Sequence, residues 1–171
     1  MTSKNQERAN ELLAQGLQFI KDKQISEAKE VLQESIDLFA TPEAYTYLGW
    51  AISLEGQYDE AITLCKKAID MDADFGNPYN DIGTYLMAKN EEVEALEWFA
   101  KAKLAKRYKN SFFPFLNVGR YYLKQERLEE AKTEFLEVVN RAPFNIEAQR
   151  FLYRISCMDG KNKHFYFCSL N

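Results

Sequence analysis

Four glycines recur along this chain at a nearly constant spacing, and each is followed twelve residues later by an alanine. The glycine spacings are 33, 34 and 36 residues. The four pairs are Gly16 and Ala28, Gly49 and Ala61, Gly83 and Ala95, and Gly119 and Ala131. Repeats of this length are typical of stacked helix pairs, each of which buries its apolar face only against its neighbours. The chain is therefore predicted to be an all-α repeat protein.

Bulky residues flank each glycine at fixed positions and divide the sequence into four units, residues 9–41, 42–75, 76–111 and 112–145. The fourth and eleventh positions of the units are Leu12 and Phe19, Tyr45 and Ile52, Tyr79 and Leu86, and Phe115 and Tyr122. These positions are about two helical turns apart, so they share one face of a first helix in each unit. The alanine starts a similar stripe on a second helix. The glycine is interpreted as a packing residue that lets another helix approach.

The order of these residues resembles the tetratricopeptide repeat family, whose pattern is a bulky residue, Leu-Gly, a Tyr-like residue, Ala, a Phe-like residue, Ala and a closing Pro. The resemblance covers about residues 9–145. The closing proline occurs only as Pro143, and Gln15 replaces the usual leucine before Gly16. The resemblance implies a right-handed superhelical solenoid of four helix-turn-helix repeats.

The helical period continues beyond the fourth unit, and we expect residues 146–158 to form a capping helix. Ile146, Leu152 and Ile155 are placed to cover the last repeat, because the end of a solenoid otherwise exposes an apolar face. Gly160 is the expected stop of this helix. We therefore expect residues 1–158 to form a single domain, followed by a C-terminal tail of residues 159–171.

Composition and charge narrow the class of partner. The 171 residues are 46% hydrophobic and 28% charged, which is enough for one continuous core. A net charge of −4 argues against binding to nucleic acid or to an anionic membrane surface. The N-terminal residues are polar, and no run approaches the roughly 18 apolar residues of a membrane span. A cytoplasmic protein is expected.

Enzymatic chemistry is not predicted. The only histidine, His164, has no evident metal or nucleophile partner, and the sequence has no phosphate-binding glycine loop. Cys65, Cys157 and Cys168 lack the spacing of a zinc site or a disulfide framework. The sequence therefore predicts no catalytic residue, no cofactor and no metal.

The resemblance implies that a partner peptide or protein binds in a concave groove lined by the first helices. Many co-chaperones of the family hold a C-terminal carboxylate with a Lys and an Asn at the fifth and ninth positions of one unit, and no unit here has that pair. The residues expected to line the groove are Trp50, Asn77, Asn80, Thr84, Met87, Phe113, Asn117 and Arg120. Amides can bind a peptide backbone, and Trp50 and Met87 can anchor apolar side chains. The alternative is that the asparagines are only solvated and Trp50 packs within the fold.

The third unit is longer than the others, and its extra residues fall in the connection before Phe112. They are expected to widen the gap to the fourth unit or to bend the stack. Residues 101–109 of this region carry five cations, which fit a solvated helix end better than a docking patch for an acidic partner. Phe112, Phe113 and Phe115 cannot all lie on the same side of a helix, so at least one is expected to remain outside the core.

Three functions agree with these patterns. The first is an adaptor or scaffold that binds a segment of another protein. The second is a dedicated cytosolic chaperone for a secreted or assembling partner, which the chain resembles in size and charge. The third is self-association into a homo-oligomer through the aromatic tail residues Phe165, Tyr166 and Phe167. The sequence does not decide whether the concave or the convex face is used.

Overall fold

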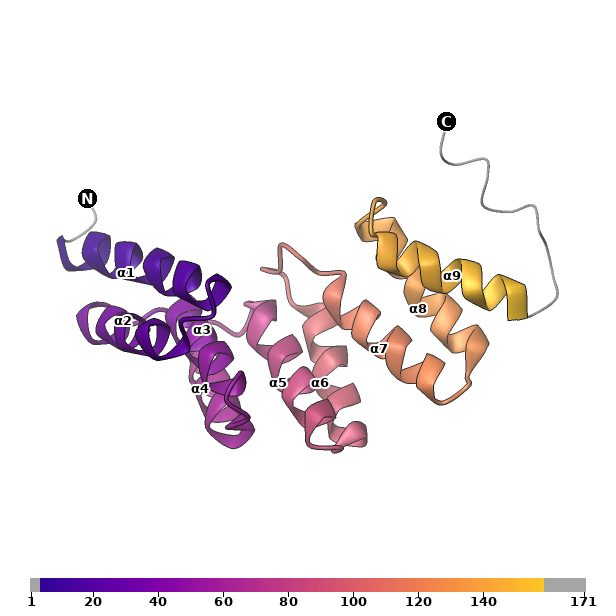
Figure 1. Cartoon of the computed structure of the whole chain (residues 1–171), viewed down its shortest axis with the longest axis horizontal. Coiled ribbons are helices and arrows are strands. Elements are labelled where there is room, and N and C mark those ends of the chain that lie inside the picture. The colour runs from indigo at the N-terminus through magenta and orange to yellow at the C-terminus, as the bar shows by residue number, and fades with distance from the viewer. Residues whose placement is uncertain (1–3, 159–171) are drawn as a thin grey trace. The chain divides into compact units, whose positions relative to one another are not determined.

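The computed structural model describes residues 4–158, and the regular elements of that range are all α-helices (Figure 1). They are α1 (Lys4–Lys21), α2 (Ile25–Leu38), α3 (Pro42–Ser53), α4 (Tyr58–Met71), α5 (Gly76–Ala88), α6 (Glu92–Leu104), α7 (Phe113–Lys124), α8 (Leu128–Arg141) and α9 (Ile146–Met158). Each of the four units predicted from the sequence corresponds to one pair of these helices, although α1 begins at Lys4, before the predicted start of the first unit at residue 9. The expected helix stop at Gly160 and the tail of residues 159–171 lie outside the described range.

The chain divides after Tyr108 into two compact units, the N-terminal unit (residues 1–108) and the C-terminal unit (residues 109–171). In the N-terminal unit, α1 packs on α2, α3 on α4 and α5 on α6, and each pair packs on the next. In the C-terminal unit, α8 packs on both α7 and α9. Both units are therefore built from helical hairpins, which confirms the all-α repeat prediction. That residues 1–158 form a single domain remains a prediction.

The recurrent glycines lie where the two helices of a hairpin approach most closely. A Cβ atom placed on Gly83 would lie 2.6 Å from Phe99 Cε1, and one on Gly119 would lie 2.7 Å from Phe135 Cε1. Such distances are far below van der Waals contact, so no larger residue fits without displacing an aromatic ring. The alanines twelve residues later are fully buried. The interpretation of the glycines as packing residues is confirmed.

Each hairpin turns at one residue in the left-handed region of backbone conformation. These residues are Lys23 (φ 61°), Gly56 (φ 81°), Asn90 (φ 63°) and Glu126 (φ 58°), and each is the fifteenth of its unit. Backbone hydrogen bonds such as Gln24 N to Phe19 O (2.9 Å) and Arg127 N to Tyr122 O (2.9 Å) close the turn. The left-handed residue reverses the chain within a few positions, so the second helix can fold back on the first.

The long connection after α6 folds back onto the N-terminal unit. Arg107 N donates to Asp74 O (2.8 Å), and Gly76 N donates to Arg107 O (3.1 Å). The ring of Tyr108 is buried and lies over Gly76, where a Cβ atom would come within 2.5 Å of it. The extra residues therefore seal the start of α5. Their effect on the spacing of the third and fourth repeats stays a prediction.

Two cations of this connection form ion pairs within the fold. This corrects part of the expectation that the cations of residues 101–109 are only solvated at a helix end. The Arg107 guanidinium forms ion pairs with Glu43 and Asp72 and lies 4.2 Å from the centre of the Phe75 ring. Lys106 pairs with Asp74 at 3.5 Å. Both cations are therefore already paired with carboxylates of this chain rather than left for an acidic partner. The reason is tertiary: the connection places Arg107 against carboxylates far away in sequence.

Helix α9 covers α8 with one apolar face. Of the three residues that were expected to form this face, two belong to it and one does not. Leu152 and Ile155 are buried with Ala148 against Phe135 and Val138. Ile146, in contrast, is 70% exposed. It is the first residue of α9 and is not part of the core that α9 shares with α8, so the prediction for Ile146 is wrong.

The three phenylalanines at the start of α7 separate as expected. Phe115 is buried, Phe112 is half-buried against the same core, and Phe113 is 39% exposed.

Candidate functional site

The residues expected to line a groove lie on the first helices of the hairpins, as predicted. In the N-terminal unit, α3 contacts both α1 and α5, so three first helices form a continuous face. This face carries Trp50 on α3 and Asn77, Thr84 and Met87 on α5. We call these four residues the first-helix face of the N-terminal unit.

Trp50 is the large exposed side chain of this face, with 37% of its surface accessible. Other residues in the same register of α3 point inward: Thr46 is fully buried and Ser53 nearly so. Their hydroxyls donate to the carbonyls of Pro42 (2.7 Å) and Trp50 (2.7 Å), which satisfies them within the helix. Trp50 therefore stands out as an aromatic surface beside small, internally bonded neighbours.

On α5, Thr84 is exposed, and Asn77 and Met87 are half-buried. Asn80 is only 7% exposed, and its Nδ2 donates to Asp81 Oδ1 at 3.4 Å. The Thr84 hydroxyl donates to Asn80 O at 3.0 Å. Asn80 thus lies beneath the face that Asn77, Thr84 and Met87 form, which gives it less access to a ligand than the sequence suggested.

A partly buried carboxylate lies next to Asn80, at the junction of the second and third repeats. Burial raises the pKa of Asp81 from 3.8 to about 7, and the hydrogen bond from Asn80 opposes this rise. Asp81 interacts electrostatically with Tyr47 of α3, Cys65 of α4 and Tyr85 of α5, and burial raises the pKa of each of these groups. Sequence reasoning missed Asp81 because a single acid in a helical stripe carries no recognisable pattern.

One edge of the first-helix face is closed by the connection after α6. Glu43, in the first turn of α3, is bound by Arg107 of that connection. Arg107 also reaches Asp72, at the end of α4. The only carboxylate of α3 is therefore already paired within the fold.

A separate hollow of about 680 Å³ lies over α2, α3 and α4 and includes none of the predicted groove residues. Its lining is Lys29, Glu30, Gln33, Glu34, Asp37, Leu48, Ile52, Glu60, Leu64 and Lys67. Six of these ten lining residues are charged, and Leu48, Ile52 and Leu64 are each at least nine-tenths buried.

In the C-terminal unit, Phe113, Asn117 and Arg120 follow one another along α7. Arg120 Nε donates to Glu147 Oε1 (3.0 Å) of α9, and Arg120 Nη1 donates to Asn117 Oδ1 (3.2 Å). Arg120 thus connects the amide of α7 to the carboxylate of α9. The predicted site residues Asn117 and Arg120 belong to one hydrogen-bonded group.

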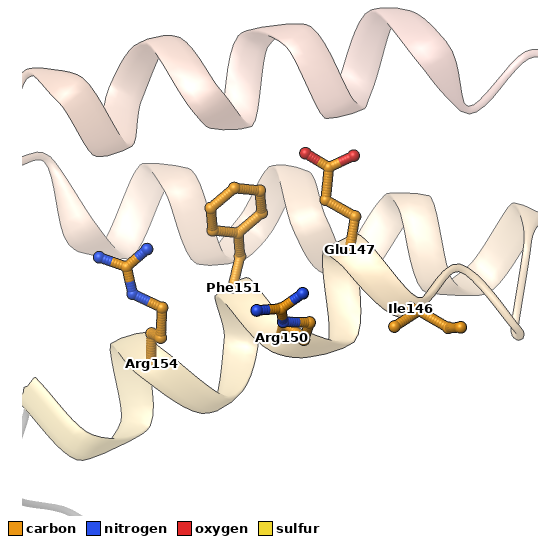
Figure 2. A pocket seen from close by; sticks show the side chains of 5 residues that line it. All are labelled: Ile146, Glu147, Arg150, Phe151 and Arg154. Carbon is orange, nitrogen blue, oxygen red and sulfur yellow. The ribbon is translucent and has the colours of Figure 1, made fainter.

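This group borders a hollow of about 520 Å³ beside α9, lined by Ile146, Glu147, Arg150, Phe151 and Arg154 (Figure 2). Glu147, Arg150 and Arg154 are the second, fifth and ninth residues of α9, the positions that Asn77, Asn80 and Thr84 occupy in the third unit. Sequence reasoning missed them because it treated α9 only as a cap. The signal was present, since the helical period continues through α9.

Two chemical properties of the described residues bear on function. Between residues 4 and 158, no group of three or more His, Cys, Asp or Glu side chains is arranged to hold a metal ion. Within the same range, none of the helices combines the length and the apolar character that crossing a bilayer requires.

A sequence profile described as a tetratricopeptide repeat matches residues 42–75 and 115–145. No curated protein matches the sequence. Among solved structures, PilF of Pseudomonas aeruginosa superimposes with a TM-score of 0.83 at 17% identity, over 92% of this chain and 72% of PilF. MamA gives 0.63 at 22% identity, over 78% and 77% of the two chains. YrrB, described as having an unusual peptide-binding site, gives 0.58 at 17% identity, over 89% and 78%.

Proposed function

We propose, from the premise that this chain belongs to the tetratricopeptide repeat family, that it is an adaptor or scaffold binding a segment of a partner protein along its first helices. Proteins of this family generally serve as protein-interaction scaffolds, and YrrB, which shares the fold, is described as having a peptide-binding site. The proposed contact residues are Trp50, Asn77, Thr84 and Met87 in the N-terminal unit and Phe113, Asn117 and Arg120 in the C-terminal unit, with Asn80 supporting the first group from beneath.

The exposed ring of Trp50 carries this proposal. Burying a tryptophan against a partner removes a large apolar surface from water, and tryptophan is enriched among the residues that dominate binding energy. Met87, half-buried on α5, can adapt its unbranched side chain to a partner. The hydroxyl of Thr84 and the amide of Asn77 supply polar groups on the same face.

The experiment is affinity purification of the tagged chain from cells, with quantitative mass spectrometry of the bound proteins. Trp50→Ala is expected to reduce recovery of the specific partner about tenfold, the loss typical of a binding hot spot. The matched control is Trp98→Ala, which truncates the second tryptophan of the chain on α6, a second helix. Circular dichroism checks that both variants keep their helical content. Equal partner recovery by wild type and Trp50→Ala would refute the proposed site.

Co-expression separates an adaptor from a chaperone. A partner that is soluble only when this chain is present would identify a chaperone, whereas a partner that folds by itself and then binds would identify an adaptor. The Trp50→Ala variant serves in both cases, because either activity requires contact with the partner.

A further inference from the structure

The hollow beside α9 is distinguished by arginines that form no ion pair with the described residues. The chain has seven arginines. Five of them form ion pairs with carboxylates of the same chain, namely Arg8, Arg107, Arg120, Arg127 and Arg141. The other two, Arg150 and Arg154, form no ion pair with any residue between 4 and 158, and both line the hollow.

We propose that this hollow binds an acidic, extended segment of a partner protein, with carboxylates on alternate residues held by Arg150 and Arg154. This inference rests on the proposed function, since it names the chemistry of one binding surface of an interaction module.

The local charge is opposite to that of the chain as a whole. The chain carries a net charge of −4, whereas the hollow contains two arginines and a single acid, Glu147. That acid is already bound by Arg120, with 3.0 Å between Arg120 Nε and Glu147 Oε1. Glu147 therefore does not neutralise Arg150 or Arg154 through an ion pair of its own. A ligand carboxylate would supply the planar acceptor that a guanidinium binds through two parallel hydrogen bonds.

The surroundings favour a peptide over a free anion. The ring of Phe151 is fixed by stacking on Phe135, with 4.8 Å between the ring centres, and forms an apolar wall of the hollow. Ile146, 70% exposed, adds a second apolar surface at the start of α9. A polypeptide can cover both with side chains while its carboxylates meet the arginines. In Figure 2, Glu147, Phe151 and Arg154 point to the same side of α9.

The spacing of the two arginines fits alternate residues of an extended chain. They are four residues apart on one helix, which corresponds to about 6 Å along the axis. Alternate side chains of an extended peptide project to the same side about 6.6 Å apart. A Glu-x-Glu or Asp-x-Asp segment lying along α9 therefore places one carboxylate at each arginine. The intervening side chain points to the opposite side.

The test uses the full chain and fluorescence anisotropy of a labelled peptide with the core Glu-Leu-Glu between Gly-Ser flanks. The peptide is amidated at its C-terminus, so that only side-chain carboxylates are presented. Comparison peptides carry Gln-Leu-Gln or Lys-Leu-Lys in the same flanks. We expect binding of the Glu peptide alone, weakened by added salt because exposed charges are screened.

The decisive variant is Arg150→Gln combined with Arg154→Gln, which keeps hydrogen-bonding side chains but removes both charges. It is expected to bind the Glu peptide about tenfold more weakly, and each single change about threefold. The matched control is Lys4→Gln with Arg8→Gln, which removes two cations at the same spacing from α1 of the N-terminal unit. The control is expected to bind as the wild type does.

Three results of the peptide titrations would overturn the inference: equal binding of the Glu and Gln peptides, full affinity in the Arg150/Arg154 double variant, or no binding of the Glu peptide. Displacement of the peptide by a single-stranded RNA oligonucleotide of higher affinity would instead identify a nucleic-acid site and also overturn it. These results are independent of the Trp50→Ala purification. Loss of partner in that variant with no acidic-peptide binding leaves the proposed function standing, whereas peptide binding with unchanged purification refutes only the Trp50 site.

Discussion

At the scale of single residues, the fold depends on a few positions with little tolerance. Gly83 and Gly119 leave room for aromatic rings that fill the hairpin interior. Asp81 places a carboxylate among tyrosines and a buried cysteine, where burial disfavours its charged form. Each feature leads to a measurable effect on stability.

Gly83→Ala is expected to lower the free energy of unfolding by about 1–3 kcal/mol, because its methyl group would overlap the ring of Phe99. Urea denaturation followed by circular dichroism measures the change. The control is Ala100→Leu, which adds bulk on the exposed side of α6 and should change stability little. A Gly83→Ala protein as stable as the wild type would show that Phe99 can move freely.

Asp81 is expected to make stability depend on pH. Its carboxyl has a pKa of about 7 in the folded chain and 3.8 as its ordinary value. Between these values the folded chain holds a proton that the unfolded chain has released, so the free energy of unfolding falls as pH rises from about 4 to about 7. Below pH 4 both states are protonated, and above pH 7 both have released the proton, so this dependence ends.

Asp81→Asn should remove that slope and raise the free energy of unfolding at pH 8 by about 2 kcal/mol, since an amide needs no water to stabilise a charge. The asparagine can still accept the hydrogen bond from Asn80. Denaturation midpoints at pH 4, 6 and 8 test this, with Glu30→Gln on the exposed surface of α2 as the control. An unchanged slope in Asp81→Asn would assign the pH dependence to another group.

At the scale of elements, the hairpin turns follow one rule that the sequence hardly displays. The fifteenth residue of every unit is left-handed, yet only Gly56 is a glycine. Lys23 and Glu126 adopt this conformation against the steric preference of residues with a Cβ atom. The connection after α6 is a second feature that the sequence hardly displays. Its two additional residues form a lid on α5 through Arg107 and Tyr108, which their sequence spacing does not indicate.

Glu126→Gly is therefore expected to stabilise the α7–α8 hairpin by about 0.5–1 kcal/mol, since glycine adopts positive φ without steric cost. Thermal unfolding of the purified chain measures the difference. The neighbouring change Gln125→Gly is the control, because Gln125 has a φ of −85° and glycine gains nothing there. If both variants lost stability equally, backbone strain at Glu126 would not be significant.

At the scale of the whole molecule, function depends on which charges and rings are left at the surface after the helices have packed. Five of the seven arginines of this acidic chain form ion pairs with its own carboxylates, whereas Arg150 and Arg154 of α9 form none with residues 4–158. The N-terminal unit, in contrast, presents Trp50. Each unit thus offers a surface of different chemistry, one aromatic and one basic. The affinity purification tests the aromatic surface, and the peptide-binding measurement tests the basic one.

The sequence alone determined the repeat, its helix pairs and its packing residues, because hydrophobic periodicity and small residues act locally and recur in every unit. It also placed Trp50, Thr84 and Met87 on first helices, since register follows from the glycines. Only the tertiary structure decided that Asn80 is buried, that Arg107 binds Glu43 and Asp72, and that Arg150 and Arg154 remain without an ion pair among residues 4–158. Burial and ion pairing depend on residues distant in sequence, and no local pattern encodes which of them meet.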